Sequence, residues 1–161
     1  MVYHRLLKEN VYMPLGSTAN KQGRIAGMNM AGDSIEFPGI IGTQIFKFFD
    51  LAIGSTGITP DQGEKKGLSI VKASSLRTSS AGYMPNAKKI DVSLYVNTET
   101  DKIVGGHFTG PLESSGVIDT IGVMAQMEMS AKEASWFDSA YAPPFAPVWN
   151  AVISAAGKYK E

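Results

Sequence analysis

Hydrophobic and polar residues alternate most regularly between residues 90 and 97. Four apolar residues there are separated by single polar ones: Ile90, Val92, Leu94 and Val96. A period of two is typical of a strand that buries one face. The polar run NTETDK follows and predicts a turn into a further strand at IVGGHFTG. This part of the sequence therefore predicts antiparallel strands on which helices pack from one side.

Helical periods occur on both sides of these strands. Residues 116–129 carry apolar side chains along one stripe, and Ser130 with Glu133 has the spacing of a capping box that opens a second helix through about Ser139. Upstream, Thr59-Pro60-Asp61-Gln62 predicts a short helix from Pro60 to Lys66 that ends at Gly67.

Two β-rich stretches flank that short helix. Residues 37–58 are dense in β-branched and aromatic side chains, which predicts one long strand with bends at Gly42 and Gly54. A second strand begins at Leu68 and ends in the small polar run of residues 75–82. The predicted fold class is therefore α+β, with a mostly antiparallel sheet covered on one face by helices.

The N-terminal part is too short to close a core of its own. Residues 1–13 resemble a connection, and a helix is predicted over 18–31, capped by Ser17 or Thr18 and ended near Gly32. The start of such a helix suits an anion or an electron-rich carbonyl, because its free N–H groups point outward. An ordinary capped helix explains the same residues. Gly23 and Gly27 would give this helix a flat face for another backbone.

The C-terminal segment YAPPFAPVW combines stiff prolines with projecting rings of Tyr141, Phe145 and Trp149. Rigid aromatic side chains of this kind suit a subunit interface or a ligand lid. Packing back onto the same domain remains an equal alternative at this point.

Composition narrows the function classes. The chain has 161 residues, 43% of them hydrophobic, with fifteen basic and fifteen acidic side chains and no cysteine. Because the charges balance, the chain has no general electrostatic field that would attract nucleic acid or a membrane surface. The absence of cysteine excludes disulfide and thiol chemistry within the chain. With no signal-peptide pattern and no membrane-length apolar run, the prediction is a soluble cytoplasmic protein.

Metal and hydrolytic chemistry are not indicated. His4 and His107 lack ligand spacing, so no metal site is predicted; an exposed polar pair, His4 with Arg5, and a structural hydrogen bond at His107 are the simpler interpretations. The serines near residues 74–80 have no His-Asp partner pattern.

Four segments in this order resemble one family: PLGSTANKQGRIAG, FPGIIGTQIFKFFDLAIGSTGIT, GYMPNA and DTIGVMAQMEMSAKEASWFDSAYAPPFAPVWN. Together they resemble the C-terminal third of the flavin-dependent pyridine nucleotide-disulfide oxidoreductases, in the branch of coenzyme A disulfide reductase, NADH oxidase and persulfide reductase. The resemblance covers nearly the whole chain.

The resemblance implies two parts and several roles. Residues 1–33 would be the last piece of an FAD domain, and 34–161 the C-terminal dimerisation domain of a homodimer. The matched positions are flavin-facing residues (Pro14, Leu15, Gly16, Ala19), tyrosines that reach the partner's active site (Tyr83, Tyr141) and residues near substrate (Asn20, Trp149).

The family's dinucleotide motifs and redox cysteine are missing, which predicts a fragment that lacks turnover and binds no FAD alone. Its parent would use NAD(P)H and FAD to reduce a disulfide, persulfide or dioxygen. Asn150 stands where Asp is common, and Ser115-Gly116 where a basic pair often begins the helix. A free-standing dimeric binding or assembly module without flavin chemistry is the alternative.

Overall fold

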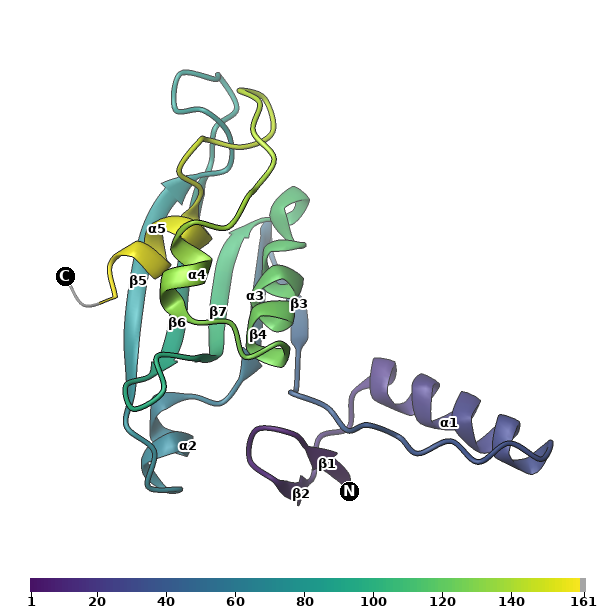
Figure 1. Ribbon diagram of the computed structural model, residues 1–161. Helices are drawn as coiled ribbons and strands as arrows, with labels where there is room; N and C mark the ends of the chain where they lie inside the picture. Colours follow the sequence, from purple (N-terminus) through teal and green to yellow (C-terminus); the bar gives the residue numbers. More distant parts are fainter. Residues whose placement is uncertain (160–161) are drawn as a thin grey trace.

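The alternating segment forms an inner strand of a five-stranded sheet in the computed structural model, which describes residues 1–159. The strands are β3 (Gln44–Phe48), β4 (Leu51–Gly57), β5 (Ile70–Thr78), β6 (Lys89–Asn97) and β7 (Ile103–Pro111). They lie in the order β3-β4-β7-β6-β5, with every neighbouring pair antiparallel (Figure 1). The strands predicted on both sides of the NTETDK turn are thus confirmed as β6 and β7.

The single long strand predicted over residues 37–58 is wrong. The chain instead reverses at Phe49 and Asp50, so that Phe48 pairs with Leu51 in the β3–β4 hairpin. Phe49 takes a left-handed φ of 51° without being glycine, which is why no turn signal was visible. Gly54 is no bend either. It lies inside β4, where an added Cβ would be 2.9 Å from Ile118 of the covering helix.

Short helices complete the fold. They are α2 (Pro60–Glu64), the 3₁₀ turn η1 (Leu112–Ser114), α3 (Val117–Gln126), α4 (Ala131–Ser135) and α5 (Ala151–Gly157). Among them, α2, α4 and α5 have a side-chain cap. The capping boxes predicted at Thr59 and Ser130 are confirmed, with both reciprocal hydrogen bonds present. Helix α4 ends earlier than predicted, and α5 was not predicted at all.

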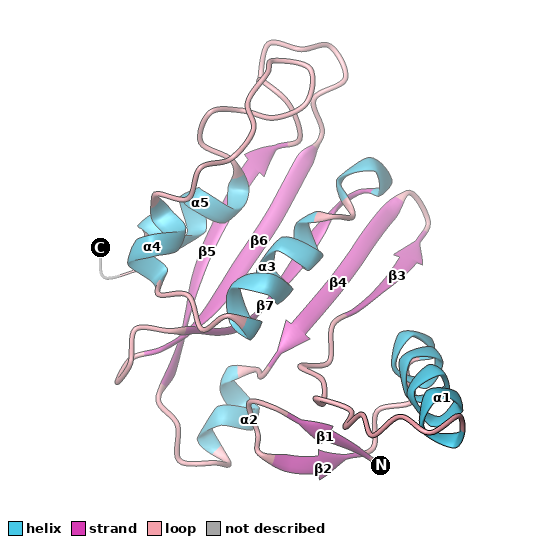
Figure 2. Cartoon of the chain, turned by 45° about the vertical axis from the view of Figure 1, so that its right-hand side comes forward, coloured by secondary structure: helices cyan, strands magenta, loops and turns pink. Residues whose placement is uncertain are grey.

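Helices α3, α4 and α5 lie on the same face of the sheet (Figure 2). The core between the layers contains fully buried side chains such as Val92, Leu94, Phe108 and Ile121. The predicted α+β class, an antiparallel sheet covered on one face by helices, is therefore confirmed.

The opposite face of the sheet has no helix over it among the described residues. Successive side chains in a strand point to opposite faces. Gly54 of β4 contacts α3, so Ile53 and its cross-strand partner Phe46 lie on the open face, as does Phe48 opposite Leu51. Phe46 and Phe48 are both more than half exposed. The open face is thus apolar at its β3–β4 edge.

The N-terminal lobe, residues 1–33, lies beside one end of the sheet (Figure 1). Residues 1–13 are more than a connection, because β1 (Val2–His4) and β2 (Glu9–Val11) form an antiparallel hairpin. The helix predicted over 18–31 is confirmed as α1 (Gly16–Met30), and Gly32 follows it with a φ of 112°. Only Thr18 of α1 is buried.

Candidate functional site

The first turn of α1 gathers the four residues expected to face a flavin. Pro14, Leu15, Gly16 and Ala19 all line one cavity of about 330 Å³ beside the β1–β2 hairpin. Leu15 is the N-cap residue and no side chain caps the helix, so the predicted caps Ser17 and Thr18 are wrong. The first-turn N–H groups are left for an outside acceptor, as the start of any helix leaves them.

Asn20 does not join that group. It is exposed on the next turn of α1 and is not among the cavity's lining residues. The substrate role implied for Asn20 by resemblance therefore stays a prediction.

Both predicted tyrosines lie at the other end of the sheet. Tyr83 is in the loop between β5 and β6 and Tyr141 in the loop between α4 and α5, and both side chains are exposed, at 76% and 52%. The two loops are joined because the Ala81 N–H donates to the Pro143 carbonyl at 2.9 Å. We call this end, residues 79–88 with 136–150, the aromatic tip.

Trp149 belongs to the same tip. Its ring meets that of Trp136 edge to face, with centroids 6.3 Å apart, and more than half of its surface is exposed. The aromatic tail is therefore attached to its own domain, but its rings stay largely exposed, so an interface or lid role for them stays a prediction.

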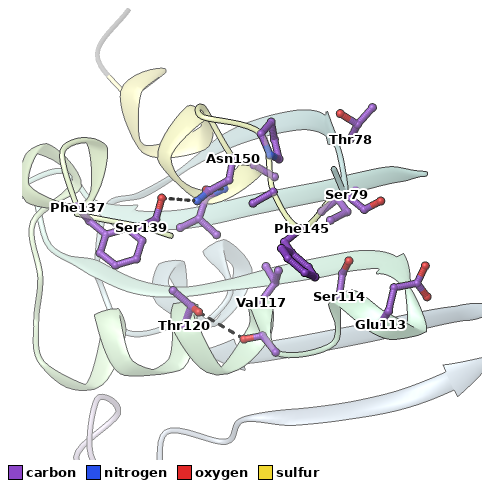
Figure 3. Close-up of a pocket in the computed structure, with 16 residues that line it drawn as sticks. Thr78, Ser79, Glu113, Ser114, Val117, Thr120, Phe137, Ser139, Phe145 and Asn150 are labelled. Carbon is purple, nitrogen blue, oxygen red and sulfur yellow. Dashed lines mark hydrogen bonds between the residues drawn. The ribbon is translucent and has the colours of Figure 1, made fainter. Parts of the chain in front are cut away.

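A second cavity, also of about 330 Å³, lies under the tip between the sheet and α3 (Figure 3). Ser79, Val117, Ser139, Phe145 and Asn150 are among its lining residues. Sequence reasoning missed it because its walls come from five separate segments. One signal was present: an Asn directly before an alanine-rich run is a typical N-cap.

Asn150 is that cap. Its Oδ1 accepts hydrogen bonds from the N–H groups of Val152 and Ile153, each at 3.0 Å, and its Nδ2 donates to Ser139 Oγ at 3.1 Å (Figure 3). The Asn150 side chain thus caps the start of α5 and also holds the segment at Ser139, where the tail begins.

The two groups of predicted residues lie at opposite ends of the molecule. In both views the start of α1 is at the lower end of the sheet and the aromatic tip at the upper end (Figures 1 and 2). Within one chain, the tyrosines and the loop expected to face a flavin are therefore not brought together.

The histidines do not form a site. His4 is buried, contrary to the exposed pair that was predicted, and its Nδ1 accepts the Leu7 N–H at 3.2 Å. Burial lowers the pKa of His4, against a backbone hydrogen bond with Ile41 that raises it. Nδ1 of His107 shares a hydrogen bond with the Tyr95 hydroxyl at 2.9 Å, the structural role predicted. Burial and then nearby Lys72 lower the pKa of His107.

Metal-binding clusters and membrane-spanning helices are absent from residues 1–159. No group of three or more His, Asp or Glu side chains there could hold a metal ion. None of the helices in that range is both long and apolar enough to cross a bilayer.

Comparison with known proteins gives a family match. The family described as "Pyridine nucleotide-disulphide oxidoreductase, dimerisation domain" matches residues 43–152. The chain is 38% identical over 153 residues to the NAD(P)H sulfur oxidoreductase (CoA-dependent) of Pyrococcus furiosus, covering 95% of this chain and 34% of that protein. It is 31% identical over 148 residues to an NADH oxidase of Methanocaldococcus jannaschii, covering 92% and 33%.

Among solved structures, a NAD-dependent persulfide reductase from A. fulgidus superposes with a TM-score of 0.92 at 31% identity, over 97% of this chain and 29% of that one. The chain spans about a third of the length of these relatives.

Proposed function

The chain belongs to the pyridine nucleotide-disulphide oxidoreductase dimerisation family, and from that premise we propose that it is the dimerisation portion of an enzyme that uses NAD(P)H and FAD to reduce a disulfide, a persulfide or dioxygen. In this proposal residues 1–33 are the end of the FAD domain and residues 34–161 form the dimer. The relatives' names, a sulfur oxidoreductase and an NADH oxidase, support this range of acceptors.

One observation carries the proposal: the residues matched to the flavin and those matched to the active-site tyrosines are separated by the length of the sheet. A chain with this shape serves a single reaction centre only if a second copy supplies the tip. Tyr83 and Tyr141 then act in the partner's site, and Trp149 lies near the partner's substrate. Their exposure in one chain is what such a role requires.

The residues at the start of α1 fit the edge of a flavin. The helix has no side-chain cap, and an added Cβ on Gly16 would have no atom within 4 Å, so a planar ligand can approach the backbone. FAD, when bound, supplies the electron-transfer chemistry. The role of Leu15, Gly16 and Ala19 is to orient its ring system and to place amide dipoles against negative charge on it. Pro14 fixes the backbone entering this turn.

The first test asks whether the chain makes the dimer. Light scattering on the chain at micromolar concentration is expected to give twice its 17.2 kDa mass. The exposed Phe46 and Phe48 on the open face give a monomer apolar surface that association would cover. A clean monomer contradicts the dimer part of the proposal.

The second test asks about flavin. The absorbance spectrum of the purified chain is expected to lack a flavin band, because the described residues supply only one wall of a nucleotide site. Stoichiometric yellow flavin would overturn the assignment of this chain as a contributing portion.

The third test concerns Tyr141 in an enzyme that contains this chain. Tyr141→Phe removes one hydroxyl and is expected to lower turnover about tenfold, the worth of one hydrogen bond made in the reaction, with the unfolding midpoint unchanged. Phe145→Leu in the same loop is the matched control. Unchanged turnover with a lowered midpoint would reassign Tyr141 to packing.

A further inference from the structure

The loop that carries Tyr141 and Trp149 is closed at its base by two polar side chains. Between Ser139 and Asn150 the chain leaves the helical layer, turns at Ala142 to Ala146 and returns. The Asn150 Nδ2 to Ser139 Oγ hydrogen bond of 3.1 Å joins the two ends of this excursion (Figure 3). Compact surface loops of this length with neighbouring ends are typical carriers of function.

The rest of the loop is held by few bonds. The N–H groups of Phe145 and Ala146 donate to the Ala142 carbonyl, at 2.9 and 3.0 Å, which shapes the turn but does not attach it to the protein. Attachment comes from the Ala81–Pro143 backbone bond and from Ser154, whose Oγ donates to the Trp149 carbonyl at 3.3 Å. On the side where the chain approaches Tyr141, Phe137 packs against the core, and Ser139 is held by its hydrogen bond with Asn150.

Ser154 is itself fixed to the sheet. The Arg77 Nε of β5 donates to Ser154 Oγ at 3.0 Å. A chain of polar contacts thus runs from β5 through α5 to Trp149, and the next residue, Asn150, continues it to Ser139. The C-terminal end of the loop, at Trp149, is therefore bonded to the sheet through Ser154. The N-terminal end, at Ser139, is bonded to Asn150.

Asn150 suits this position because an amide offers both an acceptor and a donor. Its oxygen is used by the two N–H groups at the start of α5, and its nitrogen is free for Ser139. A carboxylate at the same place would keep the cap but would need the Ser139 hydroxyl to turn and donate. Both residues are half-buried, so water competes only in part for the bond.

We propose that Asn150 and Ser139 form a clasp whose role is to position Tyr141, and through the loop Trp149, for the site that the tip serves. This inference rests on the proposed function for the purpose of the clasp, but the clasp itself is a property of this chain. Asn150 and Ser139 are positioning residues, since neither is placed against substrate or cofactor. Tyr141 is two residues from Ser139, so a bond that holds the Ser139 side chain limits how far the backbone that carries Tyr141 can move.

Four variants of the full chain separate the clasp from the helix cap. Ser139→Ala removes the clasp and leaves the cap, and Ser139→Thr keeps a hydroxyl at this position for the clasp. Asn150→Asp keeps the cap and lets Ser139 donate, whereas Asn150→Ala removes both. Ser135→Ala is the matched control, because the Ser135 hydroxyl donates to the Lys132 carbonyl within α4 and takes no part in the clasp.

Hydrogen exchange at named amides gives the first readout. Ser139→Ala is expected to speed exchange at Phe145 and Ala146 about three- to tenfold, the worth of one hydrogen bond, with Val152 and Ile153 of α5 unchanged. Asn150→Ala should speed exchange at all four amides. Asn150→Asp, Ser139→Thr and Ser135→Ala should behave as the wild type.

The second readout reports on the ring of Tyr141 and is insensitive to a purely structural cap. With 3-fluorotyrosine incorporated, the fluorine resonance of Tyr141 is expected to narrow and move toward the free amino acid in Ser139→Ala and to return in Ser139→Thr. An unchanged resonance, with exchange at Phe145 and Ala146 also unchanged, overturns the clasp. Neither readout uses flavin or turnover, so failure of the proposed function leaves this result separately interpretable.

Discussion

Helices α1 and α3 differ in what holds them. Helix α3 has ten residues of which five are buried against the sheet, whereas α1 has fifteen and buries only Thr18. Helices of the length of α1 are marginal in water without packing. The same chain therefore contains one helix that its own core stabilises and another whose side chains are almost all at least partly exposed.

The glycines of the two regions show the same contrast. An added Cβ at Gly54 under α3 would lie 2.9 Å from Ile118, but at Gly23 or Gly27 of α1 it would meet nothing within 4 Å. At Gly54 the close approach of α3 leaves no room for a side chain. At Gly23 and Gly27 no neighbouring atom of this chain occupies the space that a side chain would fill. This difference between α1 and α3 supports the division into two parts that we propose.

The largest expected change in the free energy of unfolding comes from truncating a buried apolar side chain of the sheet unit, and a truncation in α1 is the comparison. Phe108→Ala removes a fully buried ring from the core and is expected to lower the free energy of unfolding by about 3–5 kcal/mol. Ile25→Ala in the half-exposed position of α1 should cost less than about 1 kcal/mol in the same urea titration. Equal losses would mean that α1 and the sheet unfold as one unit.

A smaller effect is expected from acid. Burial lowers the pKa of His4 in the lobe and of His107 in the sheet below the ordinary value of 6.5. Between the folded and unfolded pKa values the unfolded chain binds more protons, so stability rises with pH. The stabilisation is complete above about pH 6.5 and is lost as pH falls through the lowered folded values.

The two histidines report on the two regions separately. His4→Gln should flatten the pH dependence of exchange at Arg5 and Ile40, whose backbone bonds hold the hairpin to the sheet unit. His107→Gln should flatten that of global unfolding, measured by urea titration at pH 5 to 7.5. If neither substitution changes the pH dependence, the group that titrates is neither His4 nor His107.

Much of the fold was readable because local signals agreed with packing. The period of two in β6, the stripe of α3 and the boxes at Thr59 and Ser130 each describe both a local preference and a buried face. The hairpin at Phe49 was not readable, because a left-handed aromatic residue gives no turn signal and is held there by the pairing of β3 with β4. Tertiary context overrode propensity at that turn.

The candidate site was readable only by resemblance. Composition and periodicity named no catalytic group, and residues such as Tyr83 and Pro14 entered through matched motifs alone. The cap at the start of α1 was misassigned because two hydroxyls follow Gly16, whereas the helix begins at Gly16 itself with Leu15 as its cap residue. The cavity under the tip and the double role of Asn150 depend on contacts between distant segments, which no local pattern encodes.

Removing the lobe should have a still smaller effect on the sheet unit. A chain of residues 34–161 loses the hairpin bonds to Ile40 and the partly buried Leu6 that packs on the core. We expect a loss of about 1 kcal/mol, the value of one partly buried apolar side chain, with near-ultraviolet circular dichroism retained. A chain that no longer folds would place the boundary between the two parts further toward the N-terminus.

The smallest effect on the stability of the sheet unit should come from filling the glycine face of α1. Each of Gly23→Ala and Gly27→Ala improves helix propensity by about 1 kcal/mol and places a methyl group in open space. In this chain the pair should slow amide exchange within α1 and leave the unfolding midpoint of the sheet unit unchanged. Gly54→Ala is the control, since its methyl group would collide with Ile118 and should lower that midpoint. If the α1 pair also lowers the midpoint, the glycine face already packs within this chain.

In an enzyme that contains the chain, the same pair is expected to weaken assembly, because a backbone lying against the glycine face would meet both methyl groups. A stabilised α1 in the isolated chain together with weakened assembly would show that the glycine face of α1 is a contact surface for another domain.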